Sequence, residues 1–171
     1  MHTVRRRAQT IFLLLLASSL MACGFHLRGS SSGAQLPFSA IYLDMRDGTL
    51  LERELRGAIL NQSSTVLTKN AKEAEATVRV LSDSQSRRIL TLNAQGQVRE
   101  LSLIYLLRFD VTDRSGKVLL APQDIAMEQI MTYSESQAIA KESEEKMIYT
   151  DLRSDAISQL LRQISTIKPT E

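Results

Sequence analysis

Cysteine and histidine are scarce in this chain of 171 residues, and their scarcity excludes several kinds of protein. The only cysteine is Cys23, so the chain cannot close an internal disulfide and its core must hold by packing. The two histidines, His2 and His26, lie near the N-terminus, where no rigid element would support a histidine metal site or general base. Glycine-rich phosphate loops and a Gly-x-Ser-x-Gly nucleophile turn are also lacking. We therefore expect no metal, no cofactor and no enzymatic activity. A hydrolase built from carboxylates, lysine and serine is the remaining enzymatic alternative.

Long apolar runs are lacking too, apart from one short run near the N-terminus. Three arginines, at positions 5, 6 and 7, precede an almost entirely apolar run of ten residues, 11–20. A helix that spans a membrane needs about 20 apolar residues. The run is too short for that, and its layout is typical of a secretory signal.

The apolar run ends in Leu20-Met21-Ala22-Cys23, which resembles the lipobox of bacterial lipoproteins. This resemblance implies cleavage between Ala22 and Cys23, followed by covalent attachment of diacylglycerol and an N-acyl chain such as palmitate to Cys23. Three acyl chains would anchor the protein effectively permanently, since each buried methylene contributes about 0.8 kcal/mol. Gly24, in place of an aspartate after the cysteine, implies the outer membrane of a Gram-negative envelope. An ordinary signal with an accidental cysteine is the alternative.

The charge balance of the chain changes once the signal is removed. The signal holds three of the 21 basic residues and none of the 19 acidic ones, so the remainder carries a net charge of about −1. This near-neutral balance gives no indication of nucleic acid binding. We predict a signal peptide over 1–22, a lipidated glycine- and serine-rich tether over 23–37, and one α/β domain over 38–171.

Apolar periodicity within the domain predicts an α+β fold. A capping-box pair, Thr49 and Glu52, begins a helix over 50–62, and Ser134 or Ser136 is expected to cap a last helix that ends near Lys168. Alternating apolar residues predict strands, the last of them bent or at an edge because it contains proline, over 41–45, 76–92, 100–111 and 118–133. The expected architecture is a two-layer sandwich in which two helices pack on one face of a four-stranded mixed sheet, in the order β-α-β-β-β-α.

Two short segments resemble a known family. Residues 23–28 read Cys-Gly-Phe-His-Leu-Arg, and residues 138–142 read Ala-Ile-Ala-Lys-Glu. Both are similar to segments of the LptE family of lipopolysaccharide-assembly lipoproteins, also called rare lipoprotein B. The resemblance implies an outer-membrane lipoprotein that forms a 1:1 complex with the β-barrel LptD. It would plug the barrel lumen from the periplasmic side, bind lipopolysaccharide and assist its assembly at the outer-membrane surface. A generic lipid-anchored periplasmic scaffold without lipopolysaccharide specificity is the alternative.

The same resemblance implies a ligand-binding role for Lys141. From the sequence alone, Lys141 is better explained as an i,i+4 partner of Glu145, as Lys146 is of Glu142. The expected hairpin at 92–96 contains no arginine or lysine. Arg99 and Arg88 are therefore the nearest candidates to join Lys141 in binding lipopolysaccharide phosphate, because arginine matches phosphate with a planar fork and lysine with a point charge.

Overall fold

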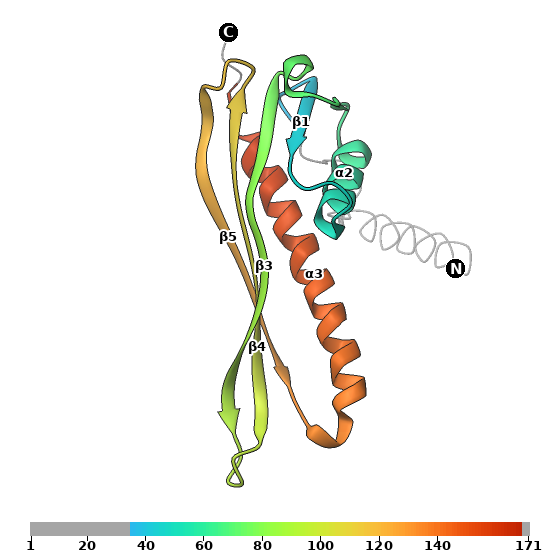
Figure 1. Cartoon of the computed structure of the whole chain (residues 1–171), viewed down its shortest axis with the longest axis vertical. Helices are drawn as coiled ribbons and strands as arrows, with labels where there is room; N and C mark the ends of the chain where they lie inside the picture. Colours follow the sequence, from blue (N-terminus) through green and yellow to red (C-terminus); the bar gives the residue numbers. More distant parts are fainter. Residues whose placement is uncertain (1–34, 169–171) are drawn as a thin grey trace, which may run out of the picture. The chain divides into compact units, whose positions relative to one another are not determined.

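The computed structural model describes residues 35–168, which form an open sheet with helices on one side (Figure 1). The predicted signal, its cleavage site and Cys23 lie outside the described residues. In chain order the elements are β1 (Ala40–Asp44), α2 (Leu50–Gln62), β2 (Val66–Leu67), the 3-10 turn η1 (Ala71–Glu73), β3 (Ala76–Leu92), β4 (Val98–Asp113), β5 (Val118–Thr132), the 3-10 turn η2 (Glu135–Gln137) and α3 (Ala138–Ser165).

The sheet has five strands in the order β2-β1-β3-β4-β5, so the prediction of four strands was wrong. The additional strand, β2, pairs parallel to β1 through Val66 and Leu67. Two residues are too few to show the alternation by which a strand is recognised in a sequence. β1 pairs parallel to β3, and β3, β4 and β5 pair antiparallel, so the sheet is mixed as predicted.

The core lies between the helices and one face of the sheet. The central strand β4 turns alternate side chains into it, and five of these are almost completely buried: Leu103, Tyr105, Leu107, Phe109 and Val111. One apolar stripe along α3 and the residues just after it is buried as well: Tyr149, Leu152, Ala156, Leu160, Ile164 and Ile167. In Figure 1, α3 runs along this face of the sheet. The core therefore depends on apolar packing, as the lack of internal disulfides led us to expect.

The two helix starts differ in how well the sequence predicted them. The hydroxyl of Thr49 accepts a hydrogen bond from the backbone N–H of Glu52 at 3.1 Å, and α2 has the predicted bounds. The predicted serine cap of α3 was wrong, because Ser134 and Ser136 bond to each other at 2.9 Å and neither caps the helix. The last strand was predicted to be bent or at an edge because it contains proline, and this is confirmed. β5 contains Pro122, is an edge strand, and shifts its register with β4 near this proline.

A charged pair links the two helices. Arg153 of α3, 5% exposed, donates from Nε and Nη2 to the two carboxylate oxygens of Glu54 on α2, both at 2.8 Å. The hydrogen bond to Glu54 raises the pKa of Arg153. Such a two-point arginine–carboxylate contact fixes the relative orientation of the two side chains.

Loss of this pair should destabilise the fold measurably. Arg153→Ala would leave the Glu54 carboxylate, one-third exposed, without its partner, and we expect a loss of about 2 kcal/mol in the free energy of unfolding. Urea unfolding followed by circular dichroism measures this. Lys146→Ala is the control, since its pair with Glu142 is largely exposed and should contribute much less to stability. Equal losses for both variants would show that burial does not strengthen the Arg153 pair.

Candidate functional site

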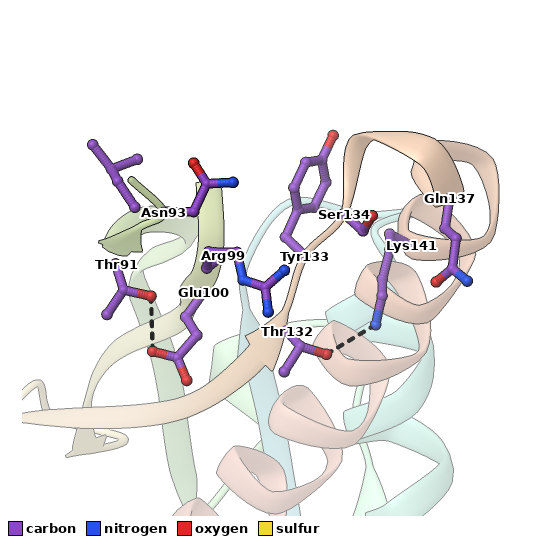
Figure 2. Close-up of a pocket in the computed structure, with 10 residues that line it drawn as sticks. Thr91, Asn93, Arg99, Glu100, Thr132, Tyr133, Ser134, Gln137 and Lys141 are labelled. Atoms are coloured by element: carbon purple, nitrogen blue, oxygen red, sulfur yellow. Dashed lines mark hydrogen bonds between the residues drawn. The ribbon is translucent and has the colours of Figure 1, made fainter. Parts of the chain in front are cut away.

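An open cavity of about 640 Å³ lies beside the start of α3. The C-terminal ends of β3 and β5 and the N-terminal end of β4 also line it. Its lining residues come from all four elements, from the turn between β3 and β4 and from the segment between β5 and α3: Thr91, Leu92, Asn93, Arg99, Glu100, Thr132, Tyr133, Ser134, Gln137 and Lys141. Figure 2 shows Arg99 and Lys141 reaching into this space from β4 and from the first turn of α3. Two of the three predicted ligand-binding residues therefore share one cavity although they are far apart in the sequence.

Lys141 is held in place within this cavity. Its side chain is only 14% exposed, and its ammonium group lies 2.8 Å from Glu144 Oε2 and 3.2 Å from Thr132 Oγ1. The predicted i,i+4 partner was therefore wrong. Glu145 lies instead 3.3 Å from Arg87 on β3. Lys141 thus presents a positioned charge, with one carboxylate that an anionic ligand would have to compete against.

The predicted pair between Lys146 and Glu142 is confirmed, at 2.8 Å. The hydrogen bond from Lys146 is the main cause that lowers the pKa of Glu142. Both side chains are about two-thirds exposed or more, and neither lines the cavity that holds Lys141. Lys146 is therefore a suitable comparison for Lys141, since both lysines stand near the start of α3.

Arg99 supplies the cation of the cavity that is not neutralised by a carboxylate. Within residues 35–168 it forms no ion pair, and its backbone carbonyl accepts a hydrogen bond from Tyr133 N–H at 2.8 Å. The neighbouring Glu100 accepts a hydrogen bond from the Thr91 hydroxyl at 2.9 Å instead. A guanidinium group in this position can bind a phosphate or carboxylate without first breaking an ion pair.

Arg88, the third predicted ligand-binding residue, lies outside the cavity. It stands opposite Ser102, and its guanidinium lies 3.4 Å from Glu128, a carboxylate to which the Ser102 hydroxyl also donates. Ser102 belongs to the alternate set of β4 side chains, which turn away from the helices. Arg88 is therefore on the opposite face of the sheet and does not line the cavity.

The cavity can bind a polar ligand, and nothing in its geometry suggests a reaction. Hydroxyl and amide groups of Thr132, Ser134 and Gln137 stand near the two cations, and Tyr133 adds an aromatic ring. The sequence reasoning missed these four residues, because hydroxyl and amide groups after a strand give no signal that distinguishes a lining residue from a turn residue. Among the described residues, no group of three or more potential ligands could hold a metal ion. Within residues 35–168, no helix is long and apolar enough to cross a bilayer.

Comparison with known proteins links this fold to one family. Residues 38–164 match the model of the family LptE, described as lipopolysaccharide-assembly. The LPS-assembly lipoprotein LptE of Pectobacterium atrosepticum is 26% identical over 175 residues, covering 98% of this chain and 90% of that protein. Among solved structures, lipoprotein B of Nitrosomonas europaea is 32% identical with a TM-score of 0.71, covering 83% of this chain and 90% of its own. The rare lipoprotein B of Shewanella oneidensis is 26% identical with a TM-score of 0.63, covering 74% and 94% respectively.

Proposed function

This chain belongs to the LptE family of lipopolysaccharide-assembly lipoproteins, and from this premise we propose that it binds lipopolysaccharide while it plugs the outer-membrane β-barrel LptD. Membership confirms the predicted role in lipopolysaccharide assembly and the lipoprotein class. It also agrees with the expectation that the chain is not an enzyme, because the family is defined by assembly rather than by a reaction. The proposal adds the ligand-binding residues, the barrel partner, the outer-membrane location and the lipid attached to Cys23.

The cavity containing Arg99 and Lys141 is the observation that carries the ligand proposal. Lipopolysaccharide is a phosphorylated glycolipid, so its head group offers anionic phosphates together with many sugar hydroxyls. Arg99 would bind a phosphate through its guanidinium, and Lys141 would donate to a second oxygen after releasing Glu144. Tyr133, Ser134 and Gln137 suit the sugar part, since an aromatic face and neutral polar groups surround the cations.

Removal of the Lys141 charge should weaken this binding. A charge-assisted hydrogen bond contributes about 1.5 to 3 kcal/mol, so Lys141→Ala should raise the Kd for lipopolysaccharide by about 10- to 150-fold. Titration of immobilised protein with purified lipopolysaccharide measures the Kd. Lys146→Ala is the matched control and should leave it unchanged, because Lys146 lies outside the cavity. If the two variants bind lipopolysaccharide equally well, Lys141 has no role in binding and only forms its ion pair with Glu144 within α3.

The outward face of the sheet supports the barrel proposal. Three ion pairs lie on this face: Arg79–Asp110 and Arg108–Asp124 join neighbouring strands, and Arg88–Glu128 reaches from β3 across β4 to β5. They neutralise one another's charges on a face that also exposes Leu106 and Ile130. The lumen of a transmembrane barrel is polar, and a domain with mixed, self-neutralised charges can fill such a space without leaving charges unpaired.

Two rivals make different predictions. A generic scaffold would keep the lipid anchor but would not show lipopolysaccharide binding that depends on Arg99 and Lys141. A hydrolase would release product from an ester or peptide substrate, and its activity would be lost on replacement of a carboxylate or serine. An activity screen beside the lipopolysaccharide titration distinguishes the three possibilities.

A further inference from the structure

The second half of β3 is an edge strand with no partner on one side. β1 pairs with β3 only as far as Arg79, which lies opposite Asp44, whereas β3 continues to Leu92. In the part of the chain that the structure describes, no other strand lies on that side of β3 beyond Arg79. All side chains from Leu81 to Leu92 are exposed. Such an edge presents unpaired N–H and C=O groups on which another strand can form.

The hydrogen bonds of β4 show which backbone groups of β3 point outward. Tyr133 N–H donates to the Arg99 carbonyl, so odd-numbered residues of β4 turn their backbone groups toward β5. Even-numbered residues such as Ile104 then face β3, where Ile104 lies opposite Ser86. Gln85, next to Ser86, therefore turns its N–H and C=O to the free edge, and so do the residues two positions away on either side.

The exposed segment is complementary to itself. When two copies pair antiparallel about Gln85, Asp83 of each lies opposite Arg87 of the other, and Leu81 lies opposite Ile89. Asp83 and Arg87 turn their side chains to the same face, because their β4 partners are the core residues Leu107 and Leu103. Opposite charges directly across two strands stabilise the pairing, and like charges oppose it.

Other registers lose this complementarity. In any antiparallel dimer, residues whose N–H and C=O point outward on one copy must lie opposite such residues on the other copy. The alternative registers therefore have the two-fold axis at another residue of β3. Each move of the axis by one residue changes the residue opposite a given position by two. Centring on Asp83 or Arg87 places like charges together. Centring on Ser84 or Ser86 leaves one of the charges opposite an apolar residue, Leu81 or Ile89. We propose that two copies of this chain form a two-fold symmetric dimer through Leu81–Ile89, centred on Gln85.

The other edge of the sheet does not share this property. β5 contains Pro122, which cannot donate to a new ladder. Its charged residues Asp124 and Glu128 have the same spacing as Asp83 and Arg87, but both are acidic. Antiparallel self-pairing of β5 about Ala126 would therefore bring like charges together. Of these two edges, only β3 is complementary to itself.

The surroundings of β3 leave room for a second strand. An open cavity of about 570 Å³ lies over Gln85 and Arg87 on the helix side, and its other wall is α3. Arg87 is 63% exposed, so an incoming carboxylate can reach it, and it would share its guanidinium with Glu145, 3.3 Å away. Register shifts after Val80 and after Ile89 bend β3 at both ends of the segment. These bends limit the pairing to the nine residues between the end of β1 and the far hairpin.

This dimer goes beyond the proposed function and does not depend on it. Residues 81–89 do not line the cavity that contains Arg99 and Lys141, so ligand binding and dimerisation can be tested separately. Pairing would cover an exposed strand edge while the chain is free, which is how native proteins avoid uncontrolled strand addition. In a complex with the barrel, the barrel rather than a second copy would cover this edge of β3.

A cysteine at the two-fold axis tests the contact in the full-length chain. Opposed residues of a hydrogen-bonded antiparallel pair have Cα atoms about 5.5 Å apart, a separation that a disulfide can bridge. Gln85→Cys should therefore give a disulfide-linked homodimer on mild oxidation of the full-length chain produced without the barrel and purified in detergent, seen on a non-reducing gel. Gln129→Cys, an exposed glutamine on β5, and the parent chain with Cys23 alone are the controls and should stay monomeric.

A charge exchange in the Gln85→Cys chain tests the register. Asp83→Arg or Arg87→Asp alone should reduce the crosslinked fraction severalfold, and the double exchange should restore it. Circular dichroism should show that the single and double exchanges all stay folded at the assay temperature, although replacement of Arg87 removes its pair with Glu145. This separates a lost contact from a lost fold. A Gln85→Cys chain that stays monomeric, that crosslinks to a different polypeptide, or whose double exchange crosslinks no better than the single ones would overturn the dimer.

Discussion

A chain in which Cys23 is replaced with serine should be completely missing from the outer membrane. The lipobox resemblance makes the Cys23 sulfur the site of diacylglycerol attachment, and no second thiol in the sequence could replace it. Without acyl chains the signal is either not cut, which holds the chain at the inner membrane, or cut to give a chain with no anchor. Because three acyl chains hold a lipoprotein effectively permanently, the change should be all or none rather than graded.

Membrane fractionation with an antibody to the domain measures this distribution. Ser31→Ala is the control, since it changes a hydroxyl of the same tether but leaves the lipobox intact. The fold of residues 35–168 should be unaffected, because Leu36 is the one described tether residue that packs against the core, and neither variant changes it. Outer-membrane recovery of Cys23→Ser at the level of the parent chain would show that the lipid proposal is wrong.

The sequence predicted the larger elements because their apolar periodicity is long. β4 shows six alternating apolar positions, and α2 has a capping pair that fixes its start, so both were located closely. β2 could not be found, since two residues carry no period and its pairing with β1 depends on where α2 returns the chain. The start of α3 was misplaced because Ser134 and Ser136 bond each other, a choice between equivalent hydroxyl partners that local sequence does not determine.

The candidate site was predictable in part for similar reasons. Lys141 and Arg99 are brought together because α3 packs back against the sheet at the end where β4 begins, and a family segment had already marked Lys141. Arg88 was included for its nearness in the sequence, but strand alternation directs it to the other face. Glu144 and Glu145 both lie within reach of Lys141 along one helix face. Which of them pairs with it depends on Arg87 of β3, a tertiary contact invisible in the helix sequence.

A shortened chain beginning at Pro37 should still form a 1:1 complex with the LptD barrel when the two are produced together. In the plug proposal the folded domain fills the lumen, so neither the acyl chains nor the tether should be needed for assembly. A domain enclosed by a barrel should bury well above roughly 2,000 Å² in total, as obligate complexes do. Contacts of that size depend mainly on packing and desolvated polar groups, and added salt screens them only weakly.

The measurement is affinity purification through a tag on the barrel, washed at about 1 M salt, where the screening length falls to about 3 Å. The stoichiometry follows from the mass of the purified complex. A matched chain with Phe109→Ala, in which a completely buried ring is removed, should lose about 3 to 5 kcal/mol of stability and be recovered poorly, since a folded domain is required. If the shortened chain is absent from the complex and only the lipidated chain is recovered, the two proteins share a membrane rather than an interface. The plug proposal would then give way to the generic scaffold.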